Sequence, residues 1–284
     1  MRERLSRREI KILDGLDKIL AGQSPGEPST FLEHKLWQAL KKFEYNEERR
    51  AKEQESVHRL MSDISHQIKT PLSALLLHLE LASDESLSHE EQAAALLESK
   101  KQADKINFLS ETIFKVAKLE SGLITVKLVD ADIVKTVNEA LSSIKAAAES
   151  KNLILGAELP DFLTVPHDPL WTKEALANIL DNAVKYTDTG RVAVKVERGA
   201  IYTRIDVEDT GIGIESEDYT KIFARFYRAR PSGTERTEGT GLGLFIAREI
   251  IRRQNGNITV GSSVGKGSVF SVFLQNRKTD VSRM

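Results

Sequence analysis

The sequence has no cysteine among its 284 residues. That absence excludes disulfides, thiolate nucleophiles and zinc–thiolate sites, and it suits a reducing compartment such as the cytosol. Long apolar runs are also missing. The longest, residues 74–82, is interrupted by His78 and Glu80 and is far shorter than the roughly 20 apolar residues that cross a bilayer. The sequence therefore predicts neither a membrane span nor a signal peptide in this chain.

A surplus of either charge is absent too. The 41 lysines and arginines nearly balance the 42 aspartates and glutamates, which leaves a formal net charge of -1. We therefore expect no broad attraction for nucleic acid or for an anionic membrane, although small basic patches are compatible with this balance. The hydrophobic share of 40% is enough for ordinary buried cores, and a chain of this length holds roughly two domains.

Helical patterns dominate the first part of the chain. A short charged helix is predicted over residues 1–24, and "QSPGEP" then marks a linker. Thr30 and Glu33 form a capping box that opens a second helix, which has the potential to continue through a very polar stretch. A helix over about 53–83 is indicated by apolar residues that recur every four and three positions, as in a coiled coil or helical bundle. These residues are Val57, Met61, Ile64, Ile68, Leu72, Leu75 and Leu79.

A second long helix is predicted after the turn "SDESLS". Ser88 and Glu91 form its capping box, and Ser121 with Gly122 provides a stop signal. The two helices would form an antiparallel hairpin. One hairpin leaves much of its apolar stripe uncovered, so we expect two copies to pair into a four-helix bundle.

The periodicity changes after Gly122. Strands are predicted at 123–129 and 153–159, in a hairpin over 191–209, and at 257–263 and 268–274. Helices are predicted at 132–150, 169–186 and 241–256, the last of them capped by Gly256. Helices on one face of a mostly antiparallel sheet make a two-layer α+β domain. The predicted fold class is therefore α+β, with a helical hairpin followed by a two-layer α/β sandwich.

The helix predicted around residues 169–186 carries a polar stripe at the edge of its apolar face. Asn178, Asn182 and Lys185 fall on this stripe at positions i, i+4 and i+7. Amide oxygens at such a place can hold a hydrated Mg²⁺, and a lysine one turn on can meet phosphate. The alternative is an ordinary helix boundary with solvated polar side chains.

Two glycine-rich turns follow. In "DTGIGI", Asp209 ends a strand, and a carboxylate there can accept a hydrogen bond from an exocyclic amine such as that of adenine. In "EGTGLGL" the glycines lead directly into a helix, whose first N–H groups suit phosphate oxygens. Between them, residues 218–236 mix aromatic side chains with arginines and predict a mobile lid. Ordinary turns and a disordered surface loop are the alternatives for these three segments.

The order of these motifs is more specific than any one of them. "NILDNAVKYT", "DTGIGI", "IFARFYRA", "GTGLGL" and "GKGSVF" follow one another as in the ATP-binding domain of sensor histidine kinases, which the second half of this chain resembles. The hairpin, with "SHQIKTPL", resembles the dimerisation and phosphoacceptor domain of that family. The resemblance covers about residues 53–276.

The resemblance implies roles for the polar stripe and the turns. Asn182 would coordinate Mg²⁺ with Asn178 nearby, and Lys185 and Tyr186 would line the nucleotide. Asp209 would bind adenine. The remaining ATP-binding residues implied are Gly211, Gly213, Gly239, Thr240, Gly241, Leu242 and Gly243, with Ser268 supporting the contact of the carboxylate.

The hairpin supplies the expected catalytic residues. In the heptad phase that places the apolar residues in the bundle, His66 lies on the solvent side, where it can accept a γ-phosphoryl group. Pro71 removes a hydrogen bond to the carbonyl of Gln67 and creates a flexible point one turn further on. The family usually has an acidic residue directly after the histidine, and Gln67 cannot act as that base. Thr70 matches the position that the family uses to place water for dephosphorylation.

The resemblance predicts an ATP-dependent protein-histidine kinase that uses ATP and Mg²⁺, autophosphorylates His66 and passes the phosphoryl group to an aspartate of a response regulator. A homodimer is implied, and a nucleic-acid partner is not. Two alternatives stay open: a phosphatase or docking scaffold with weak autokinase activity, and an ATPase clamp of the gyrase or chaperone kind. Family analogy also suggests the cytoplasmic portion of a bacterial membrane sensor, anchored through an upstream segment that this chain lacks.

The expected domain boundaries follow from these patterns. Residues 1–52 form a helical signal-input or linker segment, and residues 53–122 form the dimerisation and phosphoacceptor domain. Residues 123–278 form the ATP-binding catalytic domain, and residues 279–284 form a tail.

Overall fold

The computed structural model describes residues 31–120, 125–229 and 239–277. The chain divides into two compact units, residues 1–66 and 67–284. The helix predicted over residues 1–24, the "QSPGEP" linker, Thr30 and the stop signal at Ser121 and Gly122 lie outside the described residues.

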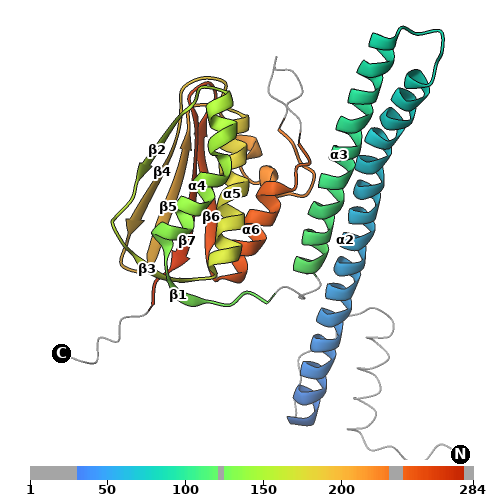
Figure 1. Ribbon diagram of the computed structural model, residues 1–284. Coiled ribbons are helices and arrows are strands. Elements are labelled where there is room, and N and C mark those ends of the chain that lie inside the picture. The colour runs from blue at the N-terminus through green and yellow to red at the C-terminus, as the bar shows by residue number, and fades with distance from the viewer. Residues whose placement is uncertain (1–30, 121–124, 230–238, 278–284) are drawn as a thin grey trace, which may run out of the picture. The chain divides into compact units, whose positions relative to one another are not determined.

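Two long helices account for the described part of the chain before residue 121. Helix α2 runs without interruption over Phe31–Ala82, so the predicted second helix does continue through the polar stretch and is longer than the range 53–83. Pro71 lies inside this helix and does not end it. Helix α3 spans His89–Glu120, and the chain reverses between the two (Figure 1). The predicted helical hairpin is confirmed.

The capping box at the start of α3 is present as predicted. The backbone N–H of Ser88 donates to a carboxylate oxygen of Glu91 at 2.8 Å, and the N–H of Glu91 donates to the hydroxyl of Ser88 at 3.3 Å. The hydroxyl of Ser88 also donates to the Glu91 carboxylate at 2.7 Å, and this bond, together with that from the Ser88 N–H, lowers the pKa of Glu91. The start of α3 is therefore specified locally, by residues three positions apart.

The hairpin leaves many large apolar side chains exposed in one copy of the chain. Leu109 is buried at 1% exposure, whereas Leu97 is 57% and Phe114 is 66% exposed. The other large apolar or aromatic side chains of α2 and α3 with at least two-fifths of their surface exposed are Phe43, Tyr45, Met61, Leu72, Leu76, Leu77, Leu79, Leu96 and Phe108. Met61, Leu72 and Leu79 of this surface belong to the apolar stripe that a second copy is expected to cover.

The part of the chain that follows α3, here called the C-terminal domain, is a two-layer α+β structure, as predicted. Its five-stranded sheet has the order β2-β4-β5-β7-β6, in which β2 pairs parallel to β4 and the other neighbours pair antiparallel. Helices α4, α5 and α6 cover one face of this sheet (Figure 1). The elements are α4 Ile133–Ser150, β2 Ile154–Glu158, α5 Pro169–Lys185, β4 Arg191–Arg198, β5 Tyr202–Asp209, α6 Gly243–Arg253, β6 Asn257–Ser263 and β7 Gly267–Gln275.

Two strands at the start of this domain differ from the prediction. The strand expected at 123–129 is wrong: residues 125–128 are not in a strand, and β1 spans Val129–Asp132. It pairs antiparallel with β3, Thr164–His167, a strand that was not predicted from the sequence. Both strands have only four residues, too few for a clear period-two pattern, so their pairing partner rather than their own sequence defines them.

The cap at the end of α6 is also different. The residue in the left-handed conformation is Asn255, with φ 58°, and not Gly256. Gly256 instead donates its backbone N–H to the carbonyl of Ile251 at 3.0 Å. Asparagine tolerates the left-handed region better than other residues with a side chain, which is why it takes this position beside the glycine.

The core lies between the helices and the sheet. Ile179 and Leu180 of α5, Ile250 of α6, and Ile205 and Val272 of the sheet are each at most 1% exposed. In α5 these apolar positions occupy one side and the amide and lysine side chains border it, so burial of the apolar side sets the direction in which the polar stripe faces.

His167 is a buried structural residue of this domain. Its ring Nδ1 lies 2.8 Å from the carbonyl of Val165 and its Nε2 lies 2.9 Å from the hydroxyl of Thr136. A carbonyl only accepts, so Nδ1 carries the proton and the neutral ring accepts from Thr136 at Nε2. Burial lowers the pKa of His167, and the carbonyl of Val165 opposes this in part.

This burial predicts a pH dependence of stability. As the pH falls below the ordinary histidine pKa of 6.5, the unfolded chain takes up a proton at residue 167 and the folded chain does not. The free energy of unfolding should therefore fall, by at most about 1.4 kcal/mol per pH unit, until the lowered folded pKa is reached. Urea denaturation at about pH 7 and about pH 5.5 measures this change. His167→Asn should lose this part of the pH dependence; an unchanged slope would contradict the assignment.

Candidate functional site

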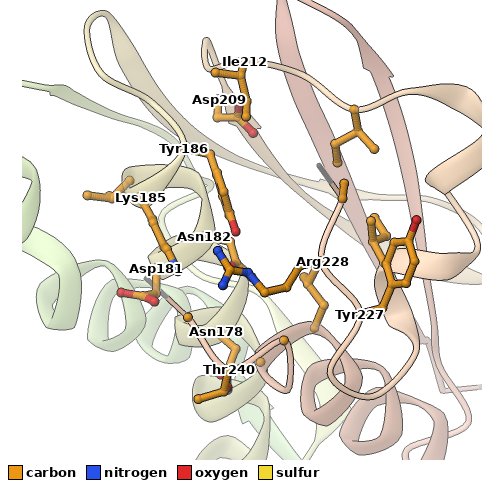
Figure 2. A pocket seen from close by; sticks show the side chains of 18 of the residues that line it. Asn178, Asp181, Asn182, Lys185, Tyr186, Asp209, Ile212, Tyr227, Arg228 and Thr240 are labelled. Carbon is orange, nitrogen blue, oxygen red and sulfur yellow. The ribbon is translucent and has the colours of Figure 1, made fainter. Parts of the chain in front are cut away.

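A cavity opens in the C-terminal domain between α5, the turn that follows β5, and the loop that precedes α6. Figure 2 shows the side chains around it. Its lining includes both glycine-rich turns and the polar stripe of α5. The residues that line it and were predicted to bind ATP are Asn178, Asn182, Lys185, Tyr186, Asp209, Gly213, Gly239, Thr240, Gly241, Gly243 and Ser268.

The polar stripe of α5 faces the loop before α6. The side-chain amide of Asn178 donates to the carbonyl of Glu174 at 2.8 Å. Its oxygen faces the loop, since a Cβ at Gly243 would lie 3.0 Å from it. The ammonium of Lys185 lies beside Gly239 and 5.3 Å from the centre of the Tyr186 ring. Amide oxygens and an ammonium thus border the same space from one helix.

Asp209 is held in one orientation at the end of β5. Its Oδ1 accepts the backbone N–H of Gly211 at 2.9 Å and that of Ser268 at 3.2 Å. The Ser268 hydroxyl is also 3.0 Å from the hydroxyl of Ser262. Burial raises the pKa of Asp209, and the two backbone donors counteract this. Gly211 therefore serves the site through its N–H group.

The glycines of the two turns allow close backbone contacts. Gly213 has φ 73°, and a Cβ there would lie 2.2 Å from the carbonyl oxygen of Ser263. Gly241 has φ 70°, and a Cβ there would lie 2.7 Å from a backbone carbon of Phe226, whose N–H donates to the Gly241 carbonyl at 2.9 Å. Any side chain at these positions would displace a neighbouring segment and so change the shape of the cavity.

Leu242 differs from its neighbours in the loop. Its side chain is 0% exposed and belongs to the hydrophobic core, and its backbone N–H donates to the hydroxyl of Thr240 at 3.2 Å. Only the backbone of Leu242 is thus available near the cavity. Its buried side chain anchors the loop directly before the first turn of α6.

The first part of the predicted lid is not a mobile loop. Residues 218–229 pack on the domain: Ile222 and Phe223 are buried, and the Phe223 ring meets the Phe270 ring edge-on at 6.4 Å. The Tyr227 hydroxyl donates to Asp218 at 2.6 Å, which lowers the pKa of Asp218. Of the aromatic residues that suggested a lid, Phe223 is a core residue, and Phe226 and Tyr227 are half-buried and pack against the core. Residues 230–238 lie outside the described residues.

Several residues that line the cavity were missed or given only a general role by the sequence. Arg228, one of the arginines of the predicted lid over residues 218–236, extends into the cavity on the side of Asn182 and Tyr186 (Figure 2). Asp181 and Ile212 also line it. Asp181 lies in the motif "NILDNAVKYT" and Ile212 in "DTGIGI". These motifs indicated that the two residues lie near the site, but not that their side chains point into the cavity.

The raised pKa of Asp209 predicts separate effects on binding and stability. Because the folded pKa lies above the unfolded value of 3.8, the carboxylate costs stability once the pH exceeds the folded pKa. Asp209→Asn should therefore not lower the urea midpoint near neutral pH. Its affinity for ATP should fall roughly tenfold, because a neutral amide oxygen accepts a weaker hydrogen bond from the adenine amine than a carboxylate does. Asp206→Asn, on the opposite face of β5, is the matched control. Unaltered ATP affinity in Asp209→Asn would argue against the adenine contact.

His66, Gln67 and Thr70 lie on α2 and all three are exposed. His66 and Thr70 are four residues apart and so lie on the same side of the helix. Pro71, the next residue, is buried. Among the other histidines, His78 is half-buried and His89 is exposed, and the side chains of His34 and His58 lie outside the described residues.

Two protein families match this chain. Residues 167–278 match the family described as histidine kinase-, DNA gyrase B- and HSP90-like ATPase, and residues 56–122 match the His Kinase A (phospho-acceptor) domain. The first match contains every predicted ATP-binding residue that lines the cavity, and the second contains His66.

Curated relatives are sensor kinases. The chain is 32% identical over 233 residues to the sensor protein kinase PmrB of Pseudomonas aeruginosa, which covers 81% of this chain and 48% of the relative. It is 31% identical over 219 residues to the sensor-like histidine kinase SenX3 of Mycobacterium tuberculosis, which covers 75% of this chain and 52% of the relative. The chain thus spans about half the length of these relatives.

Solved structures share the fold. The histidine kinase AdeS of Acinetobacter baumannii aligns with a TM-score of 0.61 at 21% identity, over 75% of this chain and 98% of that one. Full-length ShkA in complex with AMPPNP aligns with a TM-score of 0.56 at 23% identity, over 78% of this chain and 46% of that one. Among the helices of the described ranges, none has the length and apolar character required to cross a bilayer.

Proposed function

The chain belongs to the sensor histidine kinase family, and on that premise we propose that it transfers the γ-phosphoryl group of ATP to His66. The observation that carries the proposal is the pairing of two features in one chain. The amides, the half-buried carboxylate and the glycine-rich helix start that border the cavity lie within the ATPase match, and an exposed histidine lies within the phosphoacceptor match.

In this proposal the cavity binds ATP through four groups of residues. Asp209, fixed by two backbone donors, accepts the adenine amine, and Ser268 supports it. The ring of Tyr186 and the ammonium of Lys185 line the nucleotide. The backbone of residues 239–243 presents N–H groups at the start of α6, where they and the helix dipole favour phosphate oxygens. Arg228 adds a further cation beside the nucleotide.

The residues present fit a Mg²⁺ ion bound together with the nucleotide. Mg²⁺ in such sites keeps several waters and takes only one or two protein ligands besides phosphate oxygens. Asn182 supplies a half-buried amide at the rim of the core, and Asn178 presents its oxygen toward the same loop. When bound, the ion would neutralise charge on the phosphates.

The transfer itself is an exchange of one bond for another. The lone pair of a His66 ring nitrogen, Nε2, forms a bond to the γ-phosphorus while the bond from phosphorus to the bridging oxygen breaks, and ADP leaves with that electron pair. The proton on the other ring nitrogen passes to water, because Gln67 has no basic group to accept it. Catalysis would rest on positioning and charge neutralisation.

The partners follow from the same family. We propose that two copies pair through the exposed apolar surface of the hairpin, and that the phosphoryl group passes from His66 to an aspartate of a response regulator. Thr70, on the side of α2 that carries His66, would place water when the regulator is dephosphorylated. We also propose a cytoplasmic position for this portion, within a longer sensor anchored in a bacterial membrane.

Incubation with ATP labelled at the γ-phosphate tests the proposal. The expected product is a labelled protein whose label is lost in acid and kept in base, as for a phosphorus–nitrogen bond. ATP turnover without labelled protein would instead support an ATPase clamp, the alternative that the phosphoacceptor match of residues 56–122 disfavours.

A second candidate function is a phosphatase or docking scaffold with weak autokinase activity. The observation in its favour is Gln67, exposed beside His66 where the family usually has an acidic residue. Gln67→Glu should raise the initial rate of autophosphorylation if the missing base limits it. A rate equal to that of the unmodified protein would remove this reason for preferring the scaffold.

A further inference from the structure

Lys151 makes an unusual set of contacts at the back of the site. It follows the last residue of α4, where its backbone N–H donates to the Ala148 carbonyl at 3.2 Å. Its side chain crosses to the end of α5. There the ammonium donates to the carbonyls of Val184 at 3.1 Å, Lys185 at 2.9 Å and Thr187 at 3.2 Å.

These contacts complete the end of helix α5. The last four carbonyls of a helix have no partner within it, and cations are stabilising near that end. An ammonium has three N–H donors, and here three backbone carbonyls receive them. The side chain of Lys151 is 36% exposed, and the carboxylate of Asp188, itself 84% exposed, lies 3.7 Å away as an additional partner.

The helix end held by Lys151 is also a wall of the cavity. The same turn carries Asn182, Lys185 and Tyr186. The Tyr186 carbonyl accepts the N–H of Ile212 at 3.2 Å, and a Cβ at Gly211 would lie 2.3 Å from that oxygen. A shift of the end of α5 would therefore move the lysine and tyrosine and also disturb the turn that orients Asp209.

We infer that Lys151 is a positioning residue for nucleotide binding, which acts by fixing the last turn of α5 and, through Tyr186, the turn after β5. The inference rests on the proposed function. It differs from a phosphate contact: Lys151 also borders the cavity, but its three donors are directed at backbone carbonyls.

Lys151→Met tests the inference in the full chain. It keeps the length of the side chain and removes the donors, and we expect affinity for both ATP and ADP to fall roughly tenfold at temperatures where the protein is folded. Lys151→Arg should recover part of the affinity, because a guanidinium keeps the charge and several donors. The control is Lys145→Met on the same helix, whose side chain is 69% exposed with its carboxylate partner 3.9 Å away; its affinity should be unchanged.

Amide hydrogen exchange of the nucleotide-free protein distinguishes a positioning role of Lys151 from direct contact with phosphate and from a purely structural role. Positioning predicts faster exchange at Tyr186 and Ile212 in Lys151→Met than in Lys145→Met, together with the weaker binding. Weaker binding with unchanged exchange would identify a direct phosphate ligand and overturn the inference. Faster exchange or a lower melting temperature with unchanged affinity would show that Lys151 has only a structural role, and would also overturn the inference.

The same design distinguishes this inference from the proposed function. If the unmodified protein binds neither nucleotide, the proposed function fails, and the inference fails with it as a statement about binding. If the unmodified protein binds ATP and Lys151→Met binds it equally well, only the inference fails. Should Lys151→Met not fold, the comparison is made with Lys151→Arg, whose intermediate affinity and exchange rates are then the expected result.

Discussion

His66→Ala should abolish the formation of phosphorylated protein while leaving affinity for ATP unchanged. His66 supplies the nitrogen that forms the bond to phosphorus, and alanine has no group that replaces it. Phosphorylation should be lost without a loss of ATP affinity, because the proposed ATP-binding residues all belong to the C-terminal domain and not to α2. The side chain is exposed on α2, and alanine favours helices, so the substitution should not lower stability.

The measurement is a labelling time course with γ-labelled ATP, accompanied by direct titration of ATP. His78→Ala on the same helix is the control, and it should be labelled as fast as the unmodified protein. Labelled His66→Ala protein would refute the assignment of the phosphoacceptor.

Asn182→Ala should weaken binding of Mg-ATP by roughly 10- to 100-fold, a loss typical of groups that support a metal site. The side-chain oxygen of Asn182 is the proposed protein ligand of the ion, and alanine has no group that replaces it. Binding of ATP measured in the presence of a chelator should change much less, because the contacts of Asp209 and the glycine loop remain.

The quantity to compare between Asn182→Ala and the unmodified protein is therefore the gain in ATP affinity that Mg²⁺ produces. Asn138→Ala, an exposed asparagine on α4 of the same domain, is the control for loss of a helix amide. An equal loss of affinity with and without Mg²⁺ would reassign Asn182 to contact with the nucleotide itself. An affinity equal to that of the unmodified protein would remove it from the site.

Several features of this protein follow from the sequence alone, since they depend on residues close together in the chain. The helices α4, α5 and α6 follow from apolar spacing, and the start of α3 follows from Ser88 and Glu91. The polar stripe of α5 also follows, because the spacing of Asn178, Asn182 and Lys185 places them on one side of any α-helix. The exposure of His66 follows from its place in the heptad pattern.

Other features were decided by the tertiary structure. The pairing of β1 with β3, the burial of Leu242 in the core and the packing of residues 218–229 involve partners far away in the chain. Ser268 reaches Asp209 across 59 residues of sequence, and Lys151 reaches the end of α5 across 33 to 36. Local periodicity reports which side of an element is apolar, but it carries no information on which distant segment will cover that side or bond to its end. Only the folded chain brings those groups within hydrogen-bonding distance.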